Sequence, residues 1–79
     1  MDLYTEYFEN NVLQKRPYID IEWCKIAKEN YIKKEVQENG RIRYWIYIEQ
    51  YHKYLRVVYL EDNITIHNAF FDRDFNKKI

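Results

Sequence analysis

The stretch RIRYWIYIEQYHKYLRVVYLEDNITIHNAFF, residues 41–71, decides the fold. It holds most of the aromatic and β-branched residues of the chain and predicts three consecutive antiparallel strands. Side chains of its first strand alternate between two faces, which is the period of a half-buried strand. The apolar face carries Ile42, Tyr44, Ile46 and Ile48. The other face carries Arg41, Arg43, Trp45, Tyr47 and Glu49.

A turn signal sets the register of the last two strands. Asp62-Asn63 lies between two β-rich runs. Both residue types tolerate the positive φ of a two-residue hairpin turn. This turn predicts that Tyr59 pairs with Ile66.

The preceding loop, residues 50–53, sets the register of the first two strands. The apolar faces match only if Ile48 lies opposite Leu55, because a slip of one residue would turn every side chain to the other face. The two registers predict which outer-face side chains lie side by side across the three strands. One such row consists of Trp45, Val58 and His67, and the next consists of Tyr47, Arg56 and Ala69. The inner face then consists of Ile42, Tyr44, Ile46, Ile48, Leu55, Val57, Tyr59, Ile64 and Ile66.

The residues before this stretch are predicted to cover its apolar face. Residues 3–14 have a helical spacing of apolar side chains, and a short strand at 3–7 is the alternative. Asp20 predicts the N-cap of a helix over 21–30. The apolar stripe of that helix consists of Trp23, Ile26 and Ala27, with Cys24 on one flank.

Residues 31–37 predict an edge strand, and Asn39-Gly40 predicts the hairpin turn that joins it to the next strand. The expected fold class is therefore α+β, with one or two N-terminal helices packed on a four-stranded antiparallel meander. The polar residues 72–78 are predicted to be partly frayed.

The chain of 79 residues is expected to form a single domain, 1–79, near the lower size at which one core suffices. Its formal net charge is zero, so the whole molecule lacks the basic signature of many nucleic-acid-binding proteins. The charge is uneven, because residues 41–79 hold seven basic and five acidic side chains. Anion binding is therefore expected on one face rather than over the whole surface.

Cys24 is the only cysteine, which excludes an internal disulfide and favours a cytoplasmic location. No segment has the apolar length of a signal peptide or of a membrane span, so no membrane partner is expected. The single glycine excludes glycine-rich phosphate loops, and neither His52 nor His67 has metal-ligand spacing. We therefore expect no metal and no cofactor.

The outer face carries the residue types that RNA cleavage needs. Arg43 and Arg56 can fork onto phosphate oxygens, and the imidazole of His67 can move a proton near neutral pH. A 2′-hydroxyl can lose its proton to His67 or to a tyrosinate while an arginine stabilises the charge on the phosphate. The candidate catalytic residues are therefore His67, Arg56 and Arg43. The side chains that can stack on unpaired bases or add positive charge beside them are Trp45, Tyr47 and Arg41.

The charged candidates also have structural alternatives. Arg41 and Arg43 can project from an exposed strand and pair with Glu38 or Glu61. His67 can serve as a structural hydrogen-bonding residue. In that case the face is a solvated surface without chemistry.

The aromatic candidates and the remaining cations have alternatives of the same kind. Trp45 and Tyr47 can pack under the N-terminal helix or in a dimer interface. His52 is expected to be a surface histidine in a loop. Arg73 can form a surface ion pair with the aspartates on either side of it.

The run GRIRYWIYIEQYHKYLRVVYLEDNITIHNAFFDRDF, residues 40–75, resembles the core of small bacterial toxins of the RelE/ParE superfamily, especially the BrnT-like branch. The shared features are a charged and aromatic first strand, a hairpin, a hydrophobic LRVV strand, an acidic turn and a last strand that ends in a polar stretch. The resemblance covers about residues 20–75. It implies helices packed on a strongly curved antiparallel sheet. It also implies metal-independent cleavage of messenger RNA, often on the ribosome, by attack of the 2′-hydroxyl.

The resemblance further implies a cognate antitoxin that covers the active face. Relatives place basic residues on the concave sheet face and near the end of the last strand. The matching positions here are Arg43, Arg56, His67 and Arg73, which adds Arg73 to the RNA-binding set. The sequence thus predicts a toxin-like ribonuclease with RNA and an antitoxin as partners. The alternative is a non-catalytic module that binds a protein or forms a homodimer through the aromatic face.

Overall fold

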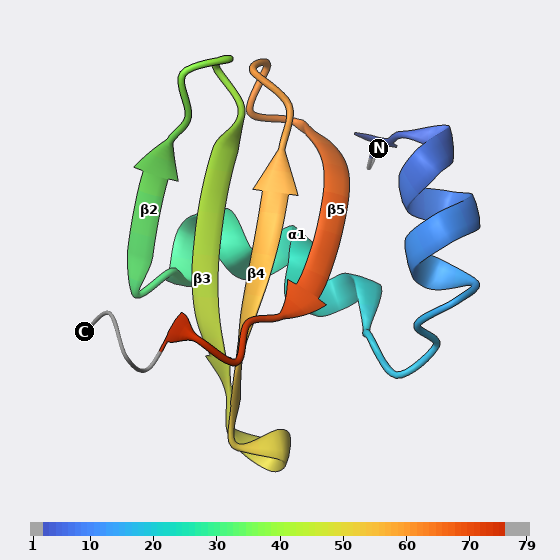
Figure 1. Ribbon diagram of the computed structural model, residues 1–79, viewed down its shortest axis with the longest axis vertical. Helices are drawn as coiled ribbons and strands as arrows, with labels where there is room; N and C mark the ends of the chain where they lie inside the picture. The colour runs from blue at the N-terminus through green and yellow to red at the C-terminus, as the bar shows by residue number, and fades with distance from the viewer. Residues whose placement is uncertain (1–2, 76–79) are drawn as a thin grey trace.

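The computed structural model describes residues 3–75, which form one five-stranded sheet with helical segments packed around it (Figure 1). The strand order is β1-β5-β4-β3-β2. The elements in chain order are β1 (Leu3–Tyr4), a π-helix (Phe8–Leu13), α1 (Ile21–Asn30), β2 (Lys33–Val36), β3 (Ile42–Ile48), a 3-10 helix (Glu49–Tyr51), β4 (Lys53–Tyr59) and β5 (Thr65–Phe71).

Strands β2 to β5 form the antiparallel meander that the sequence predicts, and the fold class is α+β. The predicted strand number is corrected from four to five, because β1 pairs in parallel with β5 and makes the sheet mixed. The first residues realise both predicted alternatives in turn. The short strand Leu3–Tyr4 comes first, and a helix that is π-helical over Phe8–Leu13 follows it.

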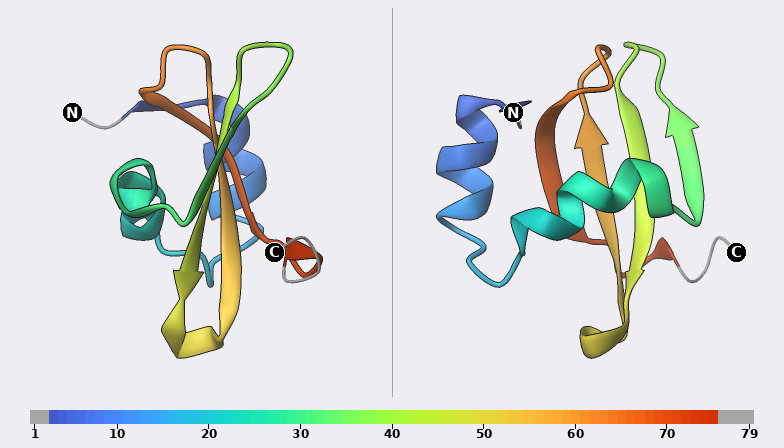
Figure 2. Two further views of the ribbon diagram at one scale, coloured as in Figure 1. Left: turned by 90° about the vertical axis from the view of Figure 1, so that its left-hand side faces the viewer. Right: turned by 180° about the vertical axis from the view of Figure 1, so that it is seen from behind.

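Helix α1 lies across one face of the sheet, here called the inner face, and the chain after β5 folds back on the opposite, outer face (Figure 2). The N-terminal helix lies beside β5 (Figure 1). The apolar core fills the space between the inner face and the helices. Every predicted inner-face residue is buried except Ile64, which is 52% exposed.

Helix α1 begins where the sequence predicts, since Asp20 Oδ1 accepts a hydrogen bond of 2.9 Å from Glu22 N. Its buried side differs from the prediction, however. Cys24 and Ala27 are buried, whereas Ile26 is 42% exposed. The two small side chains allow the helix to approach the sheet closely, and the Tyr59 hydroxyl donates to Cys24 O at 2.7 Å on this side.

The register of β3 and β4 differs from the prediction by two residues. Ile46, not Ile48, lies opposite Leu55. The loop between the strands holds a 3-10 helix followed by His52, whose φ of 53° is left-handed. A slip of two residues keeps every side chain on its predicted face, because the side-chain period of a strand is two.

A β-bulge changes the register of β4 and β5. Tyr59 pairs with Ile66 as predicted, but Val58 pairs with Asn68, so His67 is an extra residue in β5. The side chains that follow the bulge therefore lie on the face opposite to the predicted one.

The predicted outer-face rows are consequently wrong. Trp45 lies opposite Arg56, which lies opposite Phe70. Ala69, predicted on the outer face, is buried in the core opposite Val57.

The two predicted turn dipeptides do form turns, although the loops are longer than two residues. Gly40 has a φ of 89° and Asn63 a φ of 57°, both left-handed. Gln37 N donates to Arg41 O at 2.7 Å, which closes the β2–β3 turn. Ile64 lies in the β4–β5 loop and not in a strand, which explains its exposure.

The segment after β5 is packed, not frayed, as far as Phe75. The Phe75 ring is 2% exposed and stacks on Trp45 with ring centroids 5.2 Å apart. Trp45 Nε1 also donates to Asp72 Oδ2 at 3.1 Å. A single aromatic residue among charged ones has no periodicity, so sequence patterning could not detect this packing. The rest of the predicted frayed end, residues 76–78, lies outside the described residues.

Candidate functional site: a basic hollow

A hollow of about 220 Å³ opens on the outer face, where β3, β4 and β5 meet the beginning of the chain. We call it the basic hollow, and it is lined by Tyr7, Gln37, Arg41, Arg43, Arg56, Val58, His67, Asn68 and Phe70. Three guanidinium groups and an imidazole share this lining, to which no carboxylate among residues 3–75 contributes. The hollow therefore concentrates positive charge that the zero net charge of the chain does not reveal.

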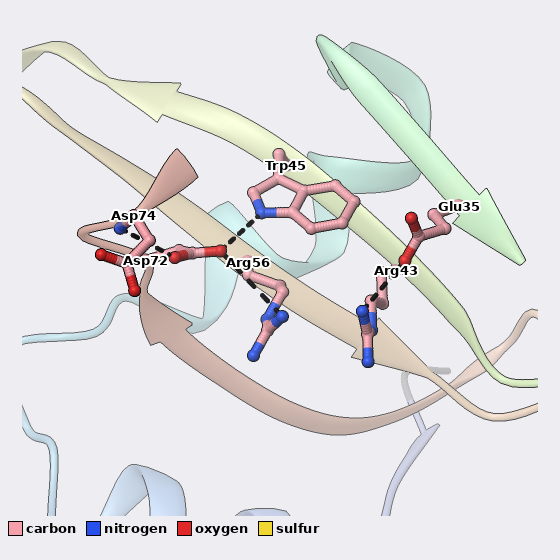
Figure 3. Close-up of polar contacts among 6 residues, drawn as sticks. All are labelled: Glu35, Arg43, Trp45, Arg56, Asp72 and Asp74. Atoms are coloured by element: carbon pink, nitrogen blue, oxygen red, sulfur yellow. Dashed lines mark hydrogen bonds and ion pairs between the residues drawn. The ribbon is translucent and has the colours of Figure 1, made fainter. Parts of the chain in front are cut away.

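Arg43 on β3 and Arg56 on β4 extend from the same face of neighbouring strands (Figure 3). Arg43 Nη1 lies 2.9 Å from Glu35 Oε1 on β2, and both side chains of this pair are partly exposed. Its acidic partner is therefore Glu35 rather than Glu38 or Glu61. A guanidinium has five N–H donors, so one ion pair leaves others for a ligand.

Arg56 is held between Phe70 and Asp72. Its guanidinium carbon lies 4.2 Å from the centroid of the Phe70 ring, and its Nη1 lies 4.0 Å from Asp72 Oδ2 (Figure 3). Burial and then repulsion from Arg43 lower the pKa of Arg56, while Asp72 and Glu35 act in the opposite direction.

The Nε of Arg56 is buried and has no hydrogen-bond partner among the described residues. Arginine stays charged at neutral pH even with a lowered pKa. Arg56 is thus a partly desolvated cation with a buried, unfilled donor, a state that costs free energy. An anionic ligand in the basic hollow would offset the cost of desolvating its charge.

His67 is the bulge residue, and its side chain lies in the lining of the hollow. Its Nδ1 lies 3.1 Å from Thr5 Oγ1, which also accepts a hydrogen bond of 3.0 Å from Phe8 N. The ring stacks on Tyr7 with centroids 5.1 Å apart. Burial, followed by repulsion from Arg41, lowers the pKa of His67. The neutral imidazole therefore predominates at neutral pH. In the tautomer whose Nδ1–H donates to Thr5 Oγ1, Nε2 is the nitrogen that can accept a proton.

Trp45 and Tyr47, the predicted base-stacking residues, do not lie in the hollow. The Trp45 ring is 2% exposed beneath Phe75. Tyr47 is 44% exposed, and its hydroxyl lies 3.1 Å from His52 Nδ1 at the other end of β3. The structure thus brings Arg41, Arg43, Arg56 and His67 together and leaves both aromatic residues apart from them.

Arg73 lies beyond β5, in a separate groove with Arg16 and Lys53. It has no ion pair with the neighbouring aspartates among the described residues, which differs from the structural alternative. Arg16 and Lys53 are not among the residues predicted from the sequence, because both lie in segments that the sequence pattern assigns to connections. Phe70 is not among them either, since only the bulge turns this residue outward.

Other chemistry has little support in the described part of the chain. Burial, together with the charge of Asp20, raises the pKa of the Cys24 thiol to about 12, so this thiol is not a ready nucleophile. No group of three or more metal-ligating side chains comes together within residues 3–75. None of the helices there has the length and apolar composition needed to cross a membrane.

Comparison with models of known protein families, with curated proteins and with solved structures gives no match. The resemblance to RelE/ParE toxins therefore remains a prediction from the sequence. The function is inferred from the geometry of the basic hollow.

Proposed function

We propose that the protein is a metal-independent endoribonuclease that cleaves single-stranded RNA in the basic hollow. The observation that supports this most directly is the grouping of His67 with Arg41, Arg43 and Arg56 around one cavity. Guanidinium groups bind phosphate oxygens, and a neutral imidazole beside them can accept the proton of a 2′-hydroxyl. RNA is the expected substrate because DNA lacks that hydroxyl.

In the proposed reaction, the 2′-oxygen forms a bond to phosphorus while the bond from phosphorus to the 5′-oxygen of the next nucleotide breaks. His67 Nε2 takes the proton of the 2′-hydroxyl, and Arg43 and Arg56 stabilise the charge that develops on the phosphate oxygens. Tyr7 has the one hydroxyl in the described lining, and it protonates the leaving 5′-oxygen. His67 then releases to water the proton it took, and Tyr7 regains a proton from water, which restores both groups. The products are a 2′,3′-cyclic phosphate and a 5′-hydroxyl.

The experiment is cleavage of a labelled single-stranded RNA by purified wild-type protein and by single variants, in the presence of a chelator. His67→Gln is expected to slow cleavage by about 10²–10⁴-fold. Arg56→Gln is expected to slow it by about 10²–10³-fold, the usual effect of losing one preorganised donor to a transition-state oxyanion. The cyclic phosphate end is identified by mass spectrometry.

The matched control is Lys25→Gln, which removes one positive charge from α1 on the inner side of the sheet (Figure 2). This variant should cleave at the wild-type rate. Cleavage that survives in His67→Gln, or that stops when the chelator is added, would contradict the proposed reaction. Failure of folded wild-type protein to cleave any RNA would contradict the nuclease function itself.

We further propose that this nuclease is the toxin of a bacterial toxin–antitoxin pair and acts on messenger RNA, free or on the ribosome, in the cytoplasm. Its antitoxin is expected to cover the basic hollow with carboxylates, since charge complementarity selects such a partner. Induced expression in a bacterial host should arrest growth and fragment messenger RNA, whereas the double variant Arg56→Gln/His67→Gln should do neither. Normal growth with abundant, folded wild-type protein would rule out the toxin role.

The competing proposal is a non-catalytic module that acts through the aromatic side chains of the outer face. Its expected centre, Trp45, is covered by Phe75, so Tyr47 is the exposed ring of the pair. Light scattering of the wild type and Tyr47→Ala tests the homodimer form of this proposal. A dimer that dissociates in the variant would favour it, and a wild-type monomer would count against it.

A further inference from the structure

A second cavity, of about 490 Å³, lies at the far end of β5 from the bulge and is larger than the basic hollow. We call it the Arg16 groove. Its charged side chains are Arg16, Lys53 and Arg73, and no carboxylate among the described residues belongs to its lining. Three positive charges around one open groove favour a ligand that carries several negative charges.

Arg16 is held in place by uncharged partners. Its Nη1 donates to Ala69 O at 2.9 Å and lies 3.4 Å from Asn68 Oδ1. Its guanidinium carbon lies 5.9 Å from the centroid of the Phe70 ring. These contacts fix the guanidinium without neutralising it, and they leave further N–H donors for a ligand. Such a preorganised cation loses little conformational freedom when a phosphate binds.

Aromatic rings form the wall of the same groove. The Tyr18 ring stacks on Phe71, with centroids 5.8 Å apart and planes inclined by 15°. Tyr51 also contacts Phe71 at 5.8 Å. Tyr18 is 51% exposed and Tyr51 is 45% exposed, so each has ring surface open to solvent. Exposed rings beside cations are the combination that binds the bases and phosphates of single strands.

The Arg16 groove adjoins the basic hollow. Phe70 lines both cavities, and Asn68, which lines the hollow, lies within hydrogen-bond distance of Arg16. Along β5 the path from His67 to Phe71 is roughly 13 Å, at the usual rise per residue of a strand. One extended nucleic-acid strand can therefore occupy both cavities at once.

We propose that the Arg16 groove binds the single-stranded RNA that flanks the phosphate in the basic hollow. Arg16, Lys53 and Arg73 contact its phosphates, and one base stacks on Tyr18 or Tyr51. The inference rests on the proposed function for its choice of RNA over other polyanions. It extends the site from one phosphate to several nucleotides, and it makes the groove the main source of substrate affinity.

The test is binding of a fluorescent, uncleavable 2′-O-methyl RNA twelve nucleotides long, measured by anisotropy. Lys53→Gln/Arg73→Gln should weaken binding by about tenfold for each lost phosphate contact. It should also reduce the slope of log affinity against log salt by about 0.7 per contact. Lys25→Gln/Lys28→Gln, which removes two charges from α1, is the matched control and should leave affinity unchanged. Arg16 is left intact in these variants because its contacts with β5 support the fold.

A second measurement separates the groove from the reaction. For cleavage of the twelve-nucleotide RNA, Lys53→Gln/Arg73→Gln should raise KM with little change in kcat. For cleavage of a dinucleotide, which cannot reach the groove, the variant should equal the wild type. His67→Gln should bind the long RNA normally and cleave neither substrate.

The outcomes distinguish the two proposals. If the wild type binds and cleaves RNA but the groove variant has unchanged affinity, the groove inference is wrong and the nuclease stands. If the groove variant binds RNA more weakly than the wild type, but neither the wild type nor any variant cleaves RNA, the nuclease proposal is wrong. The groove is then a binding site for RNA without cleavage. If the wild type does not bind RNA, both proposals are wrong, and binding of an acidic protein to the groove would then account for its charge.

Discussion

On the outer face of the sheet, the half around Arg43 and His67 is open, whereas the half around Trp45 is covered by the segment that follows β5. Both halves come from the same alternating pattern on β3, where Arg43 and Trp45 are two residues apart. The difference arises from Asp72, which accepts a hydrogen bond from the Trp45 indole, and from Phe75, which stacks on the Trp45 ring.

This contrast shows that strand periodicity determines which face a residue occupies but not whether that face is covered. The covered half contributes to stability, and the open half is available for ligands. Substitutions in the two halves should therefore separate into those that change unfolding and those that change RNA binding.

Trp45→Ala is expected to have the largest effect on stability. The free energy of unfolding should fall by about 3–5 kcal/mol, the usual cost of truncating a fully buried tryptophan. Urea unfolding followed by circular dichroism measures it. The control is Tyr47→Ala on the same strand and face, where the ring is 44% exposed and the loss should be near 1 kcal/mol or less. If both variants lost the same free energy of unfolding, the cover over Trp45 would contribute no more to stability than an exposed position does.

Phe75→Ala should have a smaller effect, about 2–3 kcal/mol, because the terminal segment can detach without opening the sheet behind it. The loss should be accompanied by exposure of Trp45. In a Trp23→Phe background, Trp45 is the only tryptophan, so its emission should shift to the red and become more accessible to acrylamide. Unchanged emission in the Phe75 variant would mean that something other than Phe75 covers the indole.

How far the sequence predicts this arrangement depends on the range of the interactions involved. Alternation and turn dipeptides are local, so they identify the meander, the N-cap Asp20 and the burial of residues such as Leu55. The bulge at His67 is a change of register between β4 and β5, and no local signal in the sequence marks it. Phe70 therefore could not be placed beside Arg56 from the sequence.

The candidate site shows the same limit. The sequence correctly groups Arg43, Arg56 and His67 on one face, because their period places them there. It cannot predict the cover of Trp45, which depends on one aromatic residue in a charged segment. Nor can it predict the Arg16 groove, because Arg16 and Lys53 are 37 positions apart and are brought together only by the folded chain.

Glu35→Gln tests the open half of the outer face, and its expected effect on RNA binding is smaller than the effects on stability above. Glu35 pairs with Arg43 at 2.9 Å on an exposed part of the face, so the pair should contribute no more than about 1 kcal/mol to stability. Loss of this carboxylate frees Arg43 for phosphate and should strengthen RNA binding by about two- to fivefold. Glu38→Gln removes the same charge from the nearby loop without touching Arg43. If both variants strengthen binding equally, the effect comes from net charge and not from Arg43.

The smallest expected effect is the dependence of stability on the protonation of His67. The pKa of His67 is lowered in the folded protein, first by burial and then by Arg41. Between this lowered pKa and the unfolded value of about 6.5, the unfolded chain binds more protons than the folded one, so stability rises with pH. Acidification through about pH 6.5 should therefore reduce stability, and the loss should end below the folded pKa. The wild type should lose more than His67→Gln when urea unfolding is compared at about pH 7.5 and about pH 5.

Salt separates the two causes of this pKa shift. High salt screens the repulsion between His67 and Arg41, because the Debye length falls to about 3 Å at about 1 M ionic strength. Burial is not screened in this way. An NMR titration of His67 should therefore show a depressed midpoint that rises only partly toward its ordinary value at high salt. A midpoint that returns fully would make Arg41 the main cause. A midpoint at or above the ordinary value in low salt would show that the imidazole is held as a cation, and His67 could then not act as the base at neutral pH.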